Sequence, residues 1–332
     1  MIPIYSLGFQ ESCYVCTTAI QYVLSLSDVV FNVSRIKRPR WNLEQPTREI
    51  KEVLREQRVR PKKSLGQRFL IDEAVVEHVI TAAELSGDDI VVEIGPGLGV
   101  LTRELAQRVK QVLAVEVDRK LVTTLRRDMS QYSNVSIVRA DILETTPSTL
   151  LSPSTSAYKV VADIPYYITS PILRQFLESS HKPERLVLMV QKEVAETIVA
   201  RPGKMSLLAV SVQYYGEAEI IANVPAESFY PIPKVDSAVL RIHVRSHPAV
   251  EVDDTDQFFA VVKAGFNSPR KQLRNSLANG LGISTAETGS LLEKASIVAT
   301  RRAETLSLEE WALLYEVVTA CYGEIEGKSN SS

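Results

Sequence analysis

Four consecutive residues, Asp163-Ile164-Pro165-Tyr166, could grip an amino group on a planar base. The Asp163 carboxylate and the Ile164 carbonyl would accept hydrogen bonds from the two N–H groups, which localises the nitrogen lone pair and makes the amine a better nucleophile. Pro165 fixes the backbone dihedral that aims the carbonyl, and Tyr166 offers a stacking face. Together with the glycine-rich turn described next, the motif predicts methyl transfer to the exocyclic amine of adenine. The alternative is a proline turn with a packed tyrosine after a core strand.

A glycine-rich turn lies about seventy residues earlier in the chain, at Glu93-Ile94-Gly95-Pro96-Gly97-Leu98-Gly99. It follows an apolar strand and opens a helix, the context in which such a turn approaches a nucleotide-like ligand closely. Glu116 ends the next strand, where it could accept hydrogen bonds from ribose hydroxyls, and Asp141 after the third strand could receive an adenine amino group. Glu93 lies between apolar residues and is expected to orient the loop. NAD and S-adenosylmethionine sites share this arrangement, so these residues leave both open.

Strand and helix patterns alternate from Asp89 onward, which predicts a doubly wound α/β sheet. The two runs Glu219–Val224 and Ala238–Val244 have no long helix between them and predict an antiparallel pair at the sheet edge. After His247 only helical patterns occur, and two capping-box sequences predict helix starts there. The apolar runs expected to form parallel strands are Ile90–Ile94, Val109–Val117, Val135–Val138, Lys159–Ala162 and Leu186–Val190.

Composition limits the interpretation of the whole chain. The 332 residues carry a formal net charge of only -2, so any RNA-binding surface must come from local basic clusters. Basic residues gather between Arg35 and Arg68, around a short amphipathic helix predicted at Thr47–Gln57; a solvated face and a phosphate-binding segment both fit. Cys13 and Cys16 form a C-x-x-C pair with no second pair to complete a zinc site. The first thirty-four residues contain no Lys or Arg, which fits neither a signal nor a transit peptide and predicts a cytoplasmic protein.

Several further motifs follow one another in a fixed order, and with them the sequence resembles the ribosomal RNA adenine N6-dimethyltransferases, in particular the bacterial enzymes that act on 16S rRNA. The resemblance runs from about Thr47 to Tyr322. It rests on the two motifs above and on Lys63-Ser64-Leu65-Gly66-Gln67-Arg68-Phe69-Leu70, Gln191-Lys192-Glu193-Val194-Ala195, Phe229-Tyr230-Pro231-Ile232-Pro233-Lys234-Val235-Asp236-Ser237, Arg270-Lys271-Gln272-Leu273-Arg274-Asn275 and Arg301-Arg302-Ala303-Glu304.

The resemblance implies N6,N6-dimethylation of two adjacent adenosines near the 3′ end of 16S rRNA in the small ribosomal subunit, with a role in ribosome biogenesis. It implies S-adenosyl-L-methionine as cosubstrate, no metal, no membrane and a monomer. The implied catalytic residues are Asp163, Ile164, Pro165 and Tyr166. The implied cofactor-binding residues are Gln67, Arg68, Leu70, Gly95, Gly97, Glu116, Asp141 and Asp163. The implied RNA-binding residues are Arg270, Lys271 and Arg274, with Arg301 and Arg302 either nearby or structural.

The sequence patterns and the resemblance together divide the chain. Residues 1–46 form an N-terminal extension of unknown role, residues 47–246 a methyltransferase domain of Rossmann-like α/β fold, residues 247–323 a small all-helical domain that contacts RNA, and residues 324–332 a polar tail.

Two positions depart from the family pattern. The family usually has asparagine where this chain has Asp163, and asparagine or histidine where it has Arg68. Aspartate serves the same acceptor role in DNA adenine methyltransferases, although it adds a negative charge beside the methyl donor. Arg68 adds a cation near the cofactor.

Three other functions compete with the leading hypothesis. A 23S rRNA adenine methylase would share the catalytic module, but Pro233–Ser237 and a basic helix predicted at Arg270–Asn275 favour the 16S enzyme. A small-subunit assembly factor with weak catalysis is a second alternative, which the Asp163 departure supports. An NAD oxidoreductase is disfavoured because no hydride-transfer constellation of histidine or lysine is present.

Overall fold

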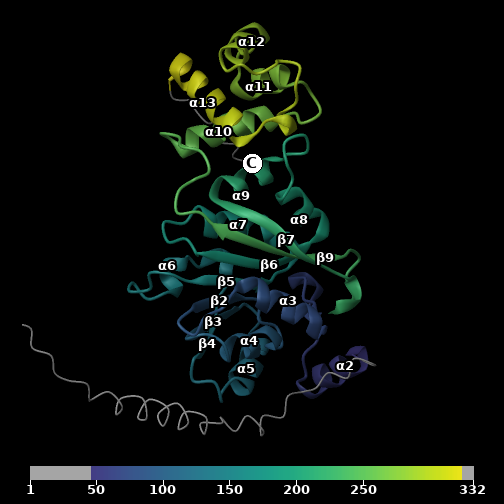
Figure 1. The fold of residues 1–332 in the computed structure, drawn as a ribbon. Helices are drawn as coiled ribbons and strands as arrows, with labels where there is room; N and C mark the ends of the chain where they lie inside the picture. Colours follow the sequence, from purple (N-terminus) through teal and green to yellow (C-terminus); the bar gives the residue numbers. More distant parts are fainter. Residues whose placement is uncertain (1–45, 324–332) are drawn as a thin grey trace, which may run out of the picture. The chain divides into compact units, whose positions relative to one another are not determined.

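The computed structural model describes residues 46–323, whose arrangement Figure 1 shows. The Cys13/Cys16 pair, the basic residues before Pro46 and the polar tail lie outside the described residues. Within residues 46–323 no helix combines the length and the apolar character needed to cross a bilayer.

A seven-stranded sheet has the order β4-β3-β2-β5-β6-β9-β7 (Figure 1). Its first five strands are parallel, whereas β9 is antiparallel to both β6 and β7. The predicted doubly wound sheet with an antiparallel edge pair is therefore confirmed. The strands are β2 (Ile90–Ile94), β3 (Gln111–Glu116), β4 (Val135–Arg139), β5 (Lys159–Asp163), β6 (Arg185–Gln191), β7 (Gly216–Val224) and β9 (Ser237–Val244).

The parallel register brings three strand ends to one edge of the sheet. Ile94, the last residue of β2, lies beside Val115 on β3 and beside Ala162 on β5. The strand order reverses at β2, where chains of this topology open a ligand crevice beyond the carboxyl ends of the strands. The residues that follow these three positions in the chain are Gly95, Glu116 and Asp163.

Helices cover both faces of the sheet because successive strand residues point to opposite sides. On β2, buried Val91 packs into the core formed with α3 and α4, whereas buried Val92 packs into the core formed with α7. The helices of this region are α3 (Glu73–Ala83), α4 (Val100–Ala106), α5 (Arg119–Asp128), α6 (Pro147–Leu150), α7 (Thr169–Leu177), α8 (Lys192–Ile198) and α9 (Leu207–Tyr215).

A second core lies among the C-terminal helices α10 (Thr255–Phe266), α11 (Leu273–Leu281), α12 (Thr285–Lys294) and α13 (Leu308–Tyr322). Trp311 is fully buried there, and Gly265 leaves room for its ring, since an added Cβ would collide with the indole. Helix α9 contributes Tyr214 to the same core, so the helical region is built onto a helix that precedes it in the chain. Both predicted capping boxes are present, at the starts of α12 and α13.

The segment before the sheet forms α2 (Pro46–Glu56), which confirms the predicted amphipathic helix because Ile50 and Leu54 are buried. A 3₁₀ turn at Lys63–Leu65 follows it. The short strand β1 (Phe69–Leu70) then pairs antiparallel with β8 (Phe229–Tyr230), which lies between β7 and β9 in the chain. This pairing joins two of the motifs recognised in the sequence.

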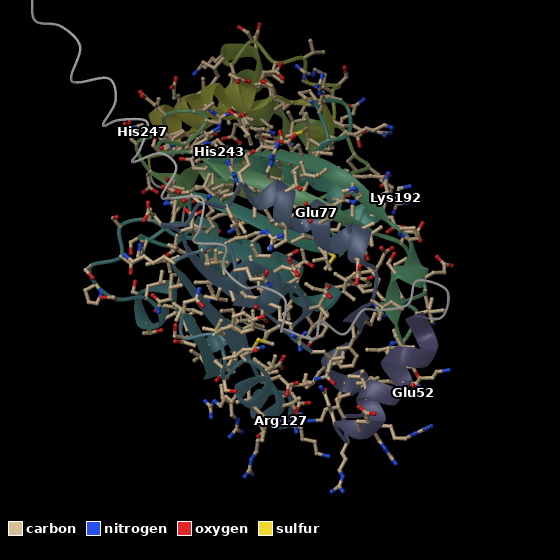
Figure 2. All side chains as sticks on the ribbon, turned by 60° about the horizontal axis from the view of Figure 1, so that its bottom comes forward. Glu52, Glu77, Arg127, Lys192, His243 and His247 are labelled. Atoms are coloured by element: carbon tan, nitrogen blue, oxygen red, sulfur yellow. The ribbon has the colours of Figure 1, made fainter. Side chains whose placement is uncertain are left out.

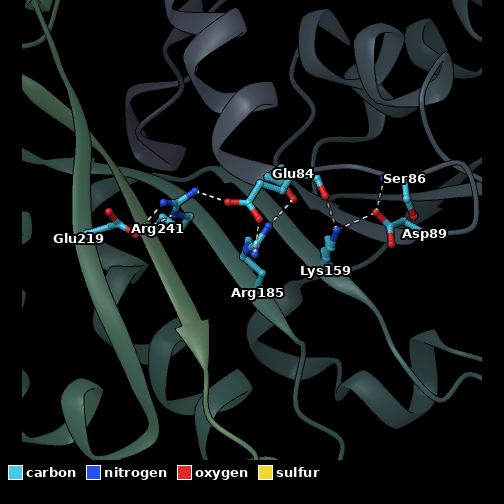
Figure 3. Close-up of polar contacts among 8 residues, drawn as sticks. Glu84, Ser86, Asp89, Lys159, Arg185, Glu219 and Arg241 are labelled. Atoms are coloured by element: carbon cyan, nitrogen blue, oxygen red, sulfur yellow. Dashed lines mark hydrogen bonds and ion pairs between the residues drawn. The ribbon is translucent and has the colours of Figure 1, made fainter.

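An ion-pair network closes the amino-terminal side of the sheet (Figure 3). The Arg185 and Arg241 guanidiniums both reach Glu84, at 2.8 and 2.6 Å, just after α3. Buried Lys159 donates to Asp89 at 2.8 Å and to the Glu84 carbonyl at 2.6 Å. Because Lys159 starts β5 and Arg185 starts β6, the network fixes α3 to the strands at the end opposite the Gly95 edge.

Candidate active site at the carboxyl edge of the sheet

One cavity of about 190 Å³ lies at the edge where β2, β3 and β5 end. Its walls come from five segments of the chain, and they hold most of the residues that the sequence singles out. The predicted site residues that line it are Gln67, Arg68, Gly95, Gly97, Glu116, Asp141, Asp163, Ile164, Pro165 and Tyr166.

The glycine turn between β2 and α4 needs its glycines for two reasons. Gly95 and Gly97 have φ of 70° and 56°, in the left-handed region that side chains disfavour. A Cβ on Gly95 would lie 3.0 Å from the Asp163 carbonyl oxygen, and one on Gly97 would lie 3.3 Å from the Phe69 ring. The glycines therefore let three loops come together around the cavity.

Glu116 supplies a buried carboxylate at the end of β3. Its side chain accepts a hydrogen bond from the Asp118 backbone N–H at 2.8 Å, and burial raises its pKa. Asp118 in turn accepts a hydrogen bond from Gln67 at 3.0 Å and forms an ion pair with Lys62 at 2.8 Å. These contacts fix the segment that carries Gln67 and Arg68 to the rim of the cavity.

Asp141 follows β4 and caps a 3₁₀ turn, where its Oδ1 accepts a hydrogen bond from the Leu143 backbone at 2.9 Å. Leu143 also lines the cavity and is 41% exposed, as is Val117 at 45%. Two exposed apolar side chains beside two carboxylates form a surface suited to an apolar ring with polar substituents.

Asp163 ends β5 and faces the cavity. Burial raises the pKa of its carboxyl to about 7, an effect that the Arg68 charge opposes. Pro165 has φ -55° and ψ 133°, which turns the chain into a 3₁₀ turn at Tyr166–Ile168. The Tyr166 hydroxyl forms a hydrogen bond with the Ser237 hydroxyl at 2.8 Å, so β9 holds the ring in place.

Three predicted site residues, Leu70, Arg270 and Lys271, lie outside the cavity lining. Leu70 is buried in the core that contains α3 and does not line the cavity. Arg270 and Lys271 are exposed but precede α11, which begins at Leu273, so the prediction of a basic helix at Arg270–Asn275 is wrong for its first part. The backbone is extended at Gln272 and the Leu273 N–H donates to the Arg301 carbonyl, which prevents an earlier helix start.

The remaining basic residues divide by role. Arg274 is exposed on the first turn of α11, near Arg270 and Lys271 in the sequence. Arg301 is structural, because its guanidinium bonds both carboxylate oxygens of Glu310 and the Thr305 carbonyl. Glu93 is buried, is absent from the cavity lining, and has a pKa raised by burial to about 8, which agrees with a role behind the loop.

No role for Asp118 or Tyr167 was predicted from the sequence. Asp118 lies two residues beyond Glu116, and its role depends on partners more than fifty residues away, so no local signal indicated it. Tyr167 lines the cavity and is 63% exposed. An added Cβ on Gly66 would lie 3.4 Å from its ring, which shows how closely the two loops approach each other.

The lining of the cavity suits the ribose and base of a nucleoside. It combines glycine backbone, two carboxylates at successive strand ends and apolar side chains between them. Among residues 46–323 no group of three or more histidine, cysteine, aspartate or glutamate side chains could hold a metal ion.

The fold and site together define a Rossmann-like methyltransferase, and solved structures agree. The chain superimposes on the 23S rRNA methyltransferase ErmE with a TM-score of 0.61 and 31% identity, over 75% of this chain and 98% of that one. A dimethyladenosine transferase from Plasmodium falciparum shares the fold, with a TM-score of 0.66 and 23% identity over 77% and 98% of the two chains.

The chain belongs to the family described as Ribosomal RNA adenine dimethylase, whose profile matches residues 58–318. It is 47% identical over 271 residues to a protein of Dehalococcoides mccartyi named Ribosomal RNA small subunit methyltransferase A, a match that covers 82% of this chain and 93% of that protein. A protein of the same name from Alkaliphilus metalliredigens is 40% identical, over 81% and 96%. The family predicted from the sequence motifs is therefore confirmed.

Proposed function

We propose that this protein transfers methyl groups from S-adenosyl-L-methionine to the N6 amines of two adjacent adenosines near the 3′ end of 16S rRNA, as a step in ribosome biogenesis. One observation carries the proposal: a single cavity is lined both by Glu116 and Asp141, suited to a nucleoside, and by Asp163 and Tyr166, suited to an adenine amine.

The cosubstrate supplies an electrophilic methyl group on a sulfonium centre. In the proposed complex the backbone at Gly95 and Gly97 lies against it, Glu116 accepts hydrogen bonds from its ribose hydroxyls, and Asp141 receives its adenine amine. Gln67, held by Asp118, lines the same cavity.

The acceptor loop acts on the target base. Asp163 and the Ile164 carbonyl accept the two N6 hydrogen bonds and localise the lone pair, while Tyr166 stacks on the ring. An ionised Asp163 is the stronger acceptor, and its pKa of about 7 means that the ionised fraction increases as the pH rises through neutrality. The chain thereby provides alignment and electrostatic stabilisation for a direct displacement. In that step the N6 nitrogen bonds to the methyl carbon as the sulfur–methyl bond breaks, S-adenosylhomocysteine leaves, and the nitrogen releases one proton to solvent.

The small subunit is the favoured substrate because the relatives at 47% and 40% identity carry that name, whereas ErmE, a 23S rRNA methyltransferase, is 31% identical. Arg270, Lys271 and Arg274 are exposed and unlike the paired Arg301, so they are the proposed phosphate contacts. We propose that the protein works as a cytoplasmic monomer without a metal.

The test is transfer of radiolabelled methyl groups to small subunits that lack the modification, with large subunits in parallel. N6,N6-dimethyladenosine in 16S rRNA alone is the expected product. Label in 23S rRNA would instead make the protein a 23S rRNA adenine methylase. Tight binding to small subunits without label would instead make it an assembly factor.

A further inference from the structure

Arg68 occupies an unusual position in the cavity. Its guanidinium carbon lies over the Tyr166 ring, 4.6 Å from the ring centroid, in cation–π contact. Both side chains line the cavity and both are half-buried. Among residues 46–323 the Arg68 guanidinium makes no hydrogen bond or ion pair, so the ring is the contact that holds it.

This position coincides with the face on which a target base would stack. Stacked aromatic rings have centroids about 4.5 to 7 Å apart, so a planar guanidinium at 4.6 Å fills the space of a planar base. The other features of the loop keep the ring in place: its hydroxyl is bonded to Ser237, and Pro165 precedes it. We therefore expect an incoming base to displace the arginine and not the tyrosine.

Arg68 also acts on Asp163. Both side chains line the cavity, Arg68 from the segment before β1 and Asp163 from the end of β5. Arg68 is the charged neighbour that lowers the Asp163 pKa against the effect of burial. The positive charge of Arg68 in the same cavity therefore favours the ionised form of Asp163.

We propose that Arg68 is a positioning residue with two roles: it covers the Tyr166 ring until the target base displaces it, and it supplies a positive charge that favours the ionised form of Asp163. This inference rests on the proposed function. Because the base must displace the guanidinium, the first role weakens RNA binding. Because an ionised carboxylate accepts hydrogen bonds more strongly, the second role increases turnover.

The two roles predict opposite effects of one substitution. Arg68→Gln frees the ring, so the KM for the subunit falls by roughly 3- to 10-fold, the range of a partly desolvated cation–π contact. The same variant removes the positive charge, so the pKa of Asp163 rises, and the acid limb of the kcat profile moves to higher pH by roughly one unit. At neutral pH kcat therefore falls while KM also falls.

Arg68→Lys separates the roles, since lysine keeps the charge but has no planar group to cover the ring. Its KM is expected to fall as in Arg68→Gln, with the acid limb close to that of the parent. In the Asp163→Asn background, Arg68→Gln is expected to leave the pH profile unchanged. Arg127→Gln, at the exposed end of α5 (Figure 2), is the matched control for the loss of one cation and should change neither parameter.

The experiment measures kcat and KM for small subunits between about pH 6 and 9, with S-adenosylmethionine affinity by calorimetry for every variant. Two results for Arg68→Gln would overturn the inference. One is a rise in KM; the other is a loss of cosubstrate affinity greater than about tenfold with no shift of the acid limb. Either result would mean that Arg68 only binds a substrate. A carboxyl titration by ¹³C NMR, assigned with Asp163→Asn, needs no substrate. If the parent protein transfers no methyl group, the proposed function fails, and an Asp163 titration unmoved by Arg68→Gln separately refutes the second role.

Discussion

The buried carboxyl of Asp163 predicts a pH-dependent change in stability that needs no RNA substrate. Burial raises its folded-state pKa from 3.8 to about 7, so the folded protein holds the proton more tightly than the unfolded chain. The stability that the protonated carboxyl contributes is complete below about pH 3.8 and is lost as the pH rises through 7. The side-chain amide of the Asp163→Asn variant stays neutral at every pH and escapes this loss.

The magnitude follows from the two pKa values. A rise from 3.8 to about 7 corresponds to about 4 kcal/mol above pH 8, an upper limit because the carboxylate faces a cavity that water can enter. About half of this amount develops between pH 5.5 and 8.5. Asp163→Asn should therefore be more stable than the parent, with an advantage that grows by up to about 2 kcal/mol over that interval.

Chemical denaturation of both proteins at pH 5.5 and at pH 8.5 measures this growth directly. Asp253→Asn, at an exposed carboxylate in the segment before α10, is the matched control and should show the same difference from the parent at both values. A stability difference for Asp163→Asn that is equal at pH 5.5 and 8.5 would refute the account of a desolvated, titrating carboxyl at the end of β5.

Three further changes test the architecture of the site and of the helical region. Gly95→Ala should lower cosubstrate affinity by more than tenfold in calorimetry, because a Cβ there meets the Asp163 carbonyl at 3.0 Å. Ser237→Ala removes the 2.8 Å hydrogen bond of the Tyr166 hydroxyl and should cost about 1 kcal/mol, seen as a several-fold lower kcat with unchanged cosubstrate affinity. Arg301→Lys loses the two-pronged pairing at the start of α13 and should destabilise the protein by about 1 to 2 kcal/mol in thermal unfolding.

Each of these changes has a control in the same chain. Gly282→Ala shares a positive φ of 72°, but its Cβ would meet nothing within 4 Å, so it should affect stability and leave cosubstrate affinity intact. Ser211→Ala removes a hydroxyl that bonds a helix carbonyl and should leave kcat unchanged. Arg302→Lys alters the more exposed ion pair with Glu304 and should leave the thermal stability unchanged. Equal effects in any variant and its control would contradict the corresponding contact.

The carboxyl edge of the sheet was predictable because strand periodicity is local and parallel strands share one direction. Gly95, Glu116 and Asp163 each follow an apolar run, and the register that aligns them is a consequence of the β-α-β order. Asp141 was predictable for the same reason. The family motifs then added the segment at Gln67 and Arg68, which no periodicity indicates.

The contacts that hold this edge together were not predictable, since they join positions far apart in the sequence. The Gln67–Asp118 hydrogen bond spans 51 positions, and the Tyr166–Ser237 bond spans 71. The predicted start of the basic helix at Arg270 was wrong because the extended backbone at Gln272 depends on contacts with residues near Arg301. Helix propensity depends on the local sequence and does not include the effect of a partner so far away in the chain.

The central claim is that Asp163 and Tyr166 present an adenine amine to a methyl donor on the small subunit. Mass spectrometry of 16S rRNA from cells that lack their own enzyme and express either this protein or Asp163→Ala tests it most directly. We expect two adjacent N6,N6-dimethyladenosines near the 3′ end with the parent chain and none with the variant, at equal protein levels. Full dimethylation with Asp163→Ala, or an unmodified 3′ end with the parent protein, would contradict the account.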